Sequence, residues 1–192
     1  MTANTQQKDF QIMDPPFAQK LFASPKWAWL WLILRVYLGY NWLMAGIEKL
    51  DNPAWTQTGA ALKGFWTNAV LVPQAPARPA IAYDWYRAFI QALLNSGSQV
   101  WFSKLVVFGE ILVGVALILG FFTGFSAFFG GFMNWNYMMA GTASTNPLLF
   151  ILAILIILAW KVAGWWGVDR WLLPLLGTPW QRGKAFKATD KS

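Results

Sequence analysis

The chain has 192 residues, of which 57% are hydrophobic and 12% charged, against about 25% charged in an ordinary soluble domain. Its apolar residues occur in long runs, which is the pattern of membrane spans and excludes a soluble domain. The net charge of +7 indicates a fixed topology and contact with anionic lipid rather than nucleic acid, because no polar segment carries a basic stripe with interleaved aromatics.

Cysteine and histidine are both absent from the sequence. Disulfides, thiol redox chemistry, iron–sulfur clusters, the usual zinc sites and the commonest haem ligand are therefore excluded. We expect no metal and no haem. Any redox chemistry then has to rest on a bound diffusible cofactor or on a partner subunit.

The chain begins with a polar segment, residues 1–26, which we expect to be a cytoplasmic N-terminal tail. Four apolar spans follow at 27–49, 101–120, 122–140 and 147–166, each close to the ~20 residues that cross a bilayer. The sequence therefore predicts an all-α membrane protein, a bundle of four transmembrane helices within residues 27–172. Residues 173–192 are expected to be a basic cytoplasmic C-terminal tail.

The connections between spans carry their own signals. The segment GFFTG at 120–124 predicts a tight hairpin between the second and third spans. Pro147 is expected to start the fourth span, where its missing N–H is harmless. The loop between the first two spans is long, and from Ile81 it has the period of an amphipathic helix. Its predicted apolar face is Ile81, Trp85, Phe89, Ala92 and Leu93, and its polar face is Asp84, Arg87, Gln91 and Asn95.

This loop helix has two interpretations. Its aromatic neighbours favour a helix that lies in the membrane interface, and the alternative is a short soluble helix that caps the bundle. The orientation of the protein follows from lysine and arginine, which are concentrated in the two tails. An even number of spans places both tails on one side, and the positive-inside rule predicts a multi-pass cell-membrane protein with both termini in the cytoplasm.

Two charged residues fall inside the predicted spans. Arg35 lies about a third of the way into the first span, and Glu110 lies near the middle of the second. A charge in hydrocarbon costs at least ~2.5 kcal/mol, so each charge needs a reason. The two spans are antiparallel and the depths roughly match, so we expect a direct or water-bridged ion pair. Glu48 and Lys49, near the outer interface, are interpreted as anchors.

Polar and small residues form a stripe on the first span, at Arg35, Gly39, Trp42, Gly46 and Lys49, where another helix can approach closely. With the next two spans we expect a polar pocket formed by Arg35, Asn41, Glu48, Glu110, Asn134 and Tyr137. Arg35 and Glu110 are the catalytic candidates, and Trp42, Asn41, Asn134 and Tyr137 are expected to bind a quinone, whose carbonyls need donors. The alternative is that Arg35 and Glu110 only lock two helices together.

Three segments resemble the DoxX/DoxD family of membrane proteins: RVYLGYNWLMAGIEKL at 35–50, GEILVGVALILG at 109–120 and GVDRWL at 167–172. The resemblance implies a four-helix membrane protein. One family member, DoxD, is a subunit of a thiosulfate:quinone oxidoreductase that works with a soluble partner, DoxA. Nothing in this chain is similar to DoxA, so a soluble DoxA-like partner or another membrane subunit is expected.

Two functions remain open at this point. The first is a membrane subunit of a quinone-linked oxidoreductase, which passes electrons from thiosulfate or a related sulfur anion, admitted near Lys63, Arg78 and Arg87, to membrane quinone. The alternative is a non-catalytic assembly subunit that docks through its Trp-rich loop and residues 171–180. A small transporter is disfavoured, because no inverted repeat and no paired mid-membrane helix break is visible.

Overall fold

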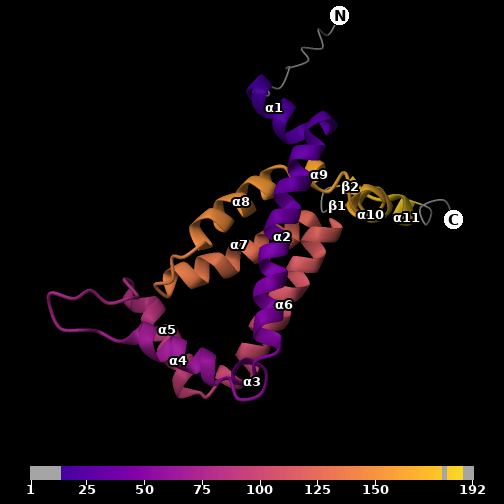
Figure 1. Cartoon of the computed structure of the whole chain (residues 1–192). Coiled ribbons are helices and arrows are strands. Elements are labelled where there is room, and N and C mark those ends of the chain that lie inside the picture. The colour runs from indigo at the N-terminus through magenta and orange to yellow at the C-terminus, as the bar shows by residue number, and fades with distance from the viewer. Residues whose placement is uncertain (1–13, 179–180, 188–192) are drawn as a thin grey trace, which may run out of the picture.

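The fold is almost entirely helical, as the sequence predicts. The computed structural model describes residues 14–178 and 181–187 (Figure 1). The elements are α1 (Pro16–Ala23), η1 (Pro25–Trp27), α2 (Ala28–Leu50), α3 (Pro53–Thr56), α4 (Ala60–Val70), α5 (Asp84–Asn95), α6 (Gln99–Leu119), α7 (Thr123–Met139), α8 (Asn146–Leu158), α9 (Trp160–Ala163), α10 (Asp169–Leu176), the short antiparallel pair β1 (Gly177–Thr178) and β2 (Gln181–Arg182), and α11 (Lys184–Lys187).

The first three predicted spans agree with α2, α6 and α7 to within two residues. The fourth differs, because the helix is interrupted at Ala159, between α8 and α9. Among the described residues, two segments are long and apolar enough to cross a bilayer, Pro25–Leu50 and Gln99–Leu119. Helices α7 and α8 are apolar but have 17 and 13 residues, fewer than the ~20 of a straight span.

Glycines bring α2 and α6 into close antiparallel contact. A Cβ on Gly39 would lie 2.9 Å from the carbonyl oxygen of Gly114, and a Cβ on Gly114 would lie 2.5 Å from the backbone nitrogen of Leu43. One turn further along, a Cβ on Gly46 would lie 2.9 Å from the backbone nitrogen of Ile111. The predicted stripe of small residues is therefore confirmed as the contact face of α2, and these contacts determine the axial register of the two helices.

The predicted hairpin between α6 and α7 is also confirmed. Gly120 ends α6 in the left-handed conformation, with φ of 68°, and Phe121 donates a backbone hydrogen bond back to Ala116. The chain then reverses into α7, and α8 packs against α7 where Gly131 leaves room for Ala153. Pro147 lies in the first turn of α8, as the sequence predicts.

The long loop forms a second small core. Leu62 and Trp66 of α4 pack with Tyr86 and Ile90 of α5 at the end of the bundle where α2 ends. The polar face of α5 is as predicted, with Arg87 paired to Asp84 at 2.6 Å and Gln91 bonded to Asn95. The buried face of α5 differs from the predicted apolar face. Trp85 and Phe89 are 59% and 47% exposed, and α4 instead covers the side of α5 that carries Tyr86 and Ile90.

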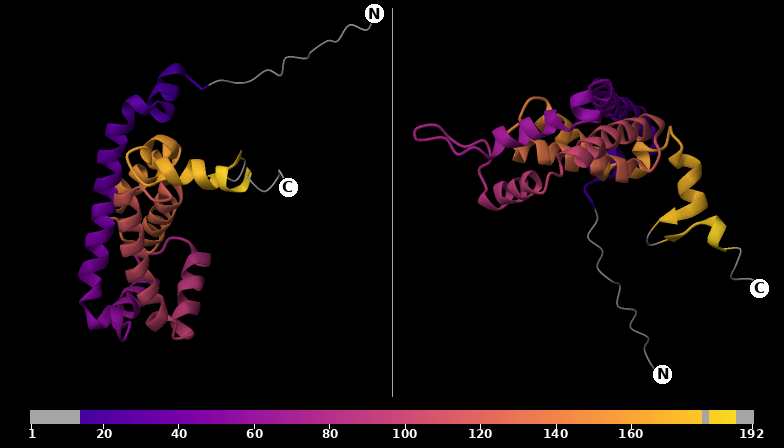
Figure 2. Two further views of the ribbon diagram at one scale, coloured as in Figure 1. Left: turned by 90° about the vertical axis from the view of Figure 1, so that its right-hand side faces the viewer. Right: turned by 90° about the horizontal axis from the view of Figure 1, so that it is seen from below.

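The described parts of both tails lie at the opposite end of the bundle. Helix α1 lies within the predicted N-terminal tail and packs on α2, where the Trp31 Nε1–H donates to the Leu21 carbonyl at 2.7 Å. Figure 2 shows α10 and α11 leaving this end as an arm that extends away from the long helices. Residues 1–13, 179–180 and 188–192 of the predicted tails lie outside the described residues.

The outer surface of the bundle is apolar. Large hydrophobic side chains are exposed on all four long helices, among them Ile33, Tyr40 and Ile47 on α2, Leu105, Phe108 and Leu112 on α6, Phe125, Phe128, Phe129 and Phe132 on α7, and Leu148, Ile151 and Leu158 on α8. A water-soluble protein does not expose so extensive an apolar surface. The sides of the bundle are therefore suited to contact with lipid.

Candidate functional site

The register of α2 and α6 places Lys49 beside Glu110. The Lys49 Nζ lies 2.8 Å from Oε2 and 3.1 Å from Oε1 of Glu110. The Glu110 side chain is 1% exposed and the Lys49 side chain 20% exposed. Lys49 also donates to the carbonyl of Ala45 and lies 5.5 Å from the centre of the Trp55 ring. The ion pair thus has a buried carboxylate and an ammonium that reaches toward the loop side.

Tyr137 completes this group from α7. Its hydroxyl donates to Glu110 Oε1 at 2.7 Å, and its ring packs edge-on against Phe65 of α4. Glu110 therefore accepts hydrogen bonds from two neighbours on two other helices. We call Lys49, Glu110 and Tyr137 the ionic triad. A buried carboxylate that accepts hydrogen bonds from a tyrosine hydroxyl and from a partly exposed lysine can hold and exchange a proton inside an apolar bundle.

The predicted ion pair between Arg35 and Glu110 is wrong. Arg35 lies level with Gly120, at the end of α6, and the ten residues from Glu110 to Gly120 span ~15 Å of helix. The prediction compared the depths of Arg35 and Glu110 counted from the ends of their spans. The glycine contacts between α2 and α6 instead determine how the two helices align. The interpretation of Lys49 as a simple interfacial anchor is wrong for the same reason, since the register makes Lys49 the partner of Glu110.

Arg35 instead joins the turns at the other end of the bundle. Its guanidinium lies between the backbones of Gly120 and Gly167, where a Cβ on either glycine would collide with Nη1. Its Nη2 donates to the carbonyl of Trp166 at 3.2 Å, and Asp169 is a nearby opposite charge. The guanidinium is therefore packed between two backbone turns, and its Nε and Nη1 have no hydrogen-bond partner among the described residues.

Asp169 explains how this end is held together. Its two carboxylate oxygens accept hydrogen bonds from the backbone N–H groups of Phe122 and Thr123, both at 2.7 Å. These are unpaired donors at the start of α7, and a carboxylate there also meets the positive end of the helix dipole. Sequence reasoning missed this role. The contact joins residues 46 and 47 positions apart, so no local sequence signal indicated it.

Two further predicted residues lie buried near the triad without polar partners. Asn134 is fully buried, and neither its amide oxygen nor its amide nitrogen has a hydrogen-bond partner among the described residues. The same holds for Trp42 Nε1, which lies against Gly130, one turn from Asn134. Gly130 also faces Val113, one turn along α6 from Glu110. Asn134 is therefore about one helical turn from Tyr137 along α7, and Trp42 is about two turns from Lys49 along α2.

The remaining predicted pocket members are not part of this group. Asn41 donates to the carbonyl of Tyr37 in its own helix at 2.8 Å, and Glu48 is exposed. Both residues follow the stripe of α2 that is adjacent to the Gly39–Gly46 contact face. Of the six residues expected to form one pocket, Glu110 and Tyr137 are in direct contact, and Asn134 is buried about one helical turn from Tyr137 on α7.

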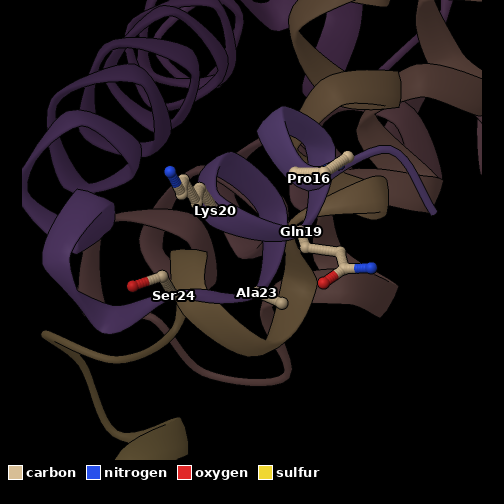
Figure 3. A pocket seen from close by; sticks show the side chains of 5 residues that line it. All are labelled: Pro16, Gln19, Lys20, Ala23 and Ser24. Carbon is tan, nitrogen blue, oxygen red and sulfur yellow. The ribbon is translucent and has the colours of Figure 1, made fainter. Parts of the chain in front are cut away.

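Two surface hollows lie elsewhere. Figure 3 shows the first, of about 340 Å³, which is lined by Pro16, Gln19, Lys20, Ala23 and Ser24 of the N-terminal segment and brings no acid and base together. The second lies among α9, α10 and the β1–β2 hairpin. Neither includes a member of the ionic triad.

The fold and the buried polar group define an all-α membrane protein with an apolar outer surface and an ionic triad between three of its helices. The chain belongs to the DoxX family, whose family model matches residues 30–143, more than half of its length. The matched stretch contains the whole triad, Trp42 and Asn134, and it ends before the GVDRWL segment. No curated protein and no solved structure matches the chain.

Proposed function

We propose that this chain is a membrane subunit of a quinone-linked oxidoreductase, DoxD-like in passing electrons from thiosulfate or a related sulfur anion to membrane quinone. One observation carries the proposal. Asn134 and Trp42 hold three buried polar atoms that have no partner among the described residues, within one to two helical turns of a buried ionic triad. A buried polar group without a hydrogen bond costs about 1–3 kcal/mol, so these atoms call for a ligand.

The donor set fits a quinone. Trp42 Nε1 and the Asn134 amide nitrogen are donors for a carbonyl oxygen, and the Asn134 amide oxygen can accept from a hydroxyl. The same residues thus suit both the carbonyl and the hydroxyl form of such a ring. A bound quinone would supply the two-electron, two-proton chemistry that a chain without cysteine and histidine lacks.

The triad has the role of holding and moving protons in this proposal. Tyr137 and Lys49 both donate to Glu110, and the Lys49 side chain is partly exposed. Together they form a connected route from the loop side to the buried carboxylate. Arg35, the other catalytic candidate, is excluded from this route by its packing between two glycines. We therefore propose Lys49 in its place.

The sulfur anion would approach from the loop side. Lys63 and Arg78 are exposed there and can attract an anion. Arg87, the third cation expected at this position, is engaged with Asp84 and with the carbonyl of Ile81. Lys63 and Arg78 are therefore the better candidates, and a DoxA-like partner would dock over them.

The proposed topology has four spans and both termini in the cytoplasm. The exposed phenylalanines of α7 and the exposed aliphatic residues of α8 support lipid contact along both helices, although each is short. The α9 extension, snorkelling of flanking residues and local thinning of the bilayer accommodate short helices. The loop with α4 and α5 then lies outside, and the exposed Trp85 and Phe89 of α5 favour a position in the membrane interface.

A second candidate is a non-catalytic assembly subunit. It is favoured by an exposed aromatic stack, in which Trp135 of α7 stacks on Phe132 at 6.0 Å and on Trp85 of α5 at 6.5 Å. Such a surface can dock another protein. In this case Trp42 and Asn134 would only pack the core.

A binding experiment separates the two candidates. A short-chain quinone is titrated into the protein in mild detergent, and saturable quenching of Trp fluorescence is followed. We expect Asn134→Leu to weaken binding at least about tenfold, because a hydrogen-bonded carbonyl loses its donor. Asn41→Leu is the matched control and should leave binding unchanged, because Asn41 bonds within its own helix.

No saturable quenching, or equal losses in both variants, would refute the quinone site. Co-purification of another membrane or soluble protein in fixed ratio, without quinone in the extracted lipid, would favour the assembly subunit.

A further inference from the structure

A hollow of about 370 Å³ lies where the C-terminal arm leaves the bundle. Three segments that are separate along the chain surround it, the start of α9, the end of α10 and the β1–β2 hairpin. Its lining consists of Trp160, Lys161, Leu173, Pro174, Gly177, Thr178, Gln181, Arg182 and Gly183. It shares no residue with the ionic triad or with the proposed quinone site, which lie toward the other end of α2.

The lining has a polar side and an apolar side. Lys161 is exposed, with its Nζ 5.5 Å from the centre of the Trp160 ring. On β1, Thr178 also lines the hollow, and its Oγ1 is buried and has no hydrogen-bond partner within the described residues. Trp160, Leu173 and Pro174 supply the apolar side. A hollow of this kind suits a ligand that joins an anionic group to a hydrocarbon chain.

Charge favours an anion at this end of the molecule. From residue 161 onward the sequence has six lysines and arginines, Lys161, Arg170, Arg182, Lys184, Lys187 and Lys191, against two acids, Asp169 and Asp190. Asp169 is buried, and both of its oxygens are held by the start of α7. The sequence of the C-terminal segment therefore carries an excess of basic residues.

The arm also has the form of a segment that lies on a membrane. Trp171 is 70% exposed and Leu175 50% exposed on α10, so this short helix presents an apolar face to its surroundings. Figure 1 shows α10 and α11 running across the direction of α2, beside the end of the bundle. A basic and aromatic segment in this orientation is typical of a helix in the membrane interface.

We propose that this hollow binds the headgroup of an anionic phospholipid. Lys161 and the Thr178 hydroxyl hold the phosphate, and Trp160, Leu173 and Pro174 contact the start of an acyl chain. The bound lipid joins the arm to the end of the bundle. This site is independent of the quinone proposal, because it uses other residues at the other end of the protein.

The test uses the full chain in neutral detergent with phosphatidylglycerol and phosphatidylcholine of identical acyl chains. Lipid affinity is measured by native mass spectrometry and by the shift of the thermal midpoint. We expect phosphatidylglycerol to bind and stabilise, and phosphatidylcholine to do neither. Lys161→Gln should weaken phosphatidylglycerol binding roughly fivefold, as expected for one cation at an anionic headgroup. Thr178→Val, which keeps the shape and removes the hydroxyl, should also weaken binding by several-fold.

Lys104→Gln is the matched control, since Lys104 is an exposed lysine near the start of α6, toward the opposite end. It should leave the affinity unchanged. Equal binding of the two lipids, or an unchanged affinity in either Lys161→Gln or Thr178→Val, would overturn the proposal. If inorganic phosphate at millimolar concentration displaces the lipid and gives the same stabilisation, the site is one for free phosphate and the lipid assignment is wrong.

Discussion

At the scale of single residues, the two intramembrane charges have different surroundings. Glu110 has a charged partner and a hydroxyl donor, whereas Arg35 is packed between glycine backbones with its Nε and Nη1 lacking a hydrogen-bond partner in the described chain. A buried charge costs several kcal/mol unless neighbours compensate it. Removing one partner should therefore be more damaging than removing both.

The first prediction concerns the Lys49–Glu110 pair. Lys49→Met leaves an unpaired carboxylate in the bundle and should lower stability in detergent by about 3 kcal/mol, and adding Glu110→Gln should restore a large part of the loss. The coupling between the two substitutions should be about 1–3 kcal/mol. Thermal unfolding of the two single variants and the double variant measures it. Arg35→Met with Glu110→Gln is the comparison pair, and coupling there equal to that of Lys49 would contradict the structure.

The second prediction concerns Gly120. Both Gly120 and Gly97 have φ of 68°, so alanine at either position costs about 1 kcal/mol of backbone strain. At Gly97 a Cβ meets nothing within 4 Å, whereas at Gly120 it collides with the guanidinium of Arg35. Gly120→Ala should therefore be destabilising by about 3 kcal/mol or more and Gly97→Ala by about 1, measured by thermal unfolding. Equal losses would show that Arg35 moves aside freely.

At the scale of elements, the close approach of α2 and α6 is the feature on which the triad depends. Gly114 lies against the backbone of Leu43, so the two helices are in backbone contact there. A side chain at this point has to push one helix away from the other. A shift of α2 along or away from α6 moves Lys49 relative to Glu110.

The third prediction follows from this contact. Gly114→Ala should lower the thermal midpoint, because its Cβ would lie 2.5 Å from a backbone atom that cannot rotate away. Gly64→Ala on α4 is the control, because a Cβ there meets nothing within 4 Å. It should be neutral or stabilising by about 0.5–1 kcal/mol, as for glycine inside an exposed helix. A Gly114→Ala variant as stable as Gly64→Ala would refute the backbone contact.

The loop elements provide the fourth prediction, through Tyr86 of α5. Its hydroxyl lies 3.1 Å from Asn136 Oδ1, and burial raises the pKa of Tyr86 to about 12. The unfolded tyrosine, with a pKa near 10, ionises first, so the folded state binds the extra proton between pH 10 and pH 12. Stability should therefore fall as pH rises through this window. In Tyr86→Phe the fall should be shallower, while Tyr83→Phe, at an exposed position, should resemble the parent protein.

At the scale of the whole molecule, the described parts of the two tails lie together at one end and the α4–α5 core at the other. Helix α1 packs on α2, and the arm leaves from the end of α9. This arrangement fits an even number of crossings, because segments on one side of a membrane lie together. Lysine and arginine in the tails then favour the cytoplasm.

The fifth prediction tests this topology by cysteine labelling in a chain that has no native cysteine. A single cysteine at Lys63, on exposed α4, should react with an impermeant reagent in intact cells. Single cysteines at Ser24 and Lys184 should react after the membrane is permeabilised and not before. Labelling of either tail position in intact cells would overturn the proposed orientation.

The sequence by itself determined the helical elements, because these depend on local signals. Local signals determine structure within a few residues along the chain. They include the apolar runs, the glycine turn at 120, Pro147 and the stripe of small residues on α2. These signals predicted three of the four long helices to within two residues and the contact face of α2. The break at Ala159 was not predicted, since no glycine or proline marks it.

The tertiary structure alone decided which buried polar residues meet. Two antiparallel helices can slide along one another without changing either sequence pattern, and each slide of one turn brings a different residue opposite Glu110. The contacts of Gly39, Gly46 and Gly114 determine that register, and it selects Lys49 rather than Arg35. The same packing buries Asn134 and Trp42 without partners, which no periodicity could reveal, because hydrogen-bond satisfaction depends on the distances between helices.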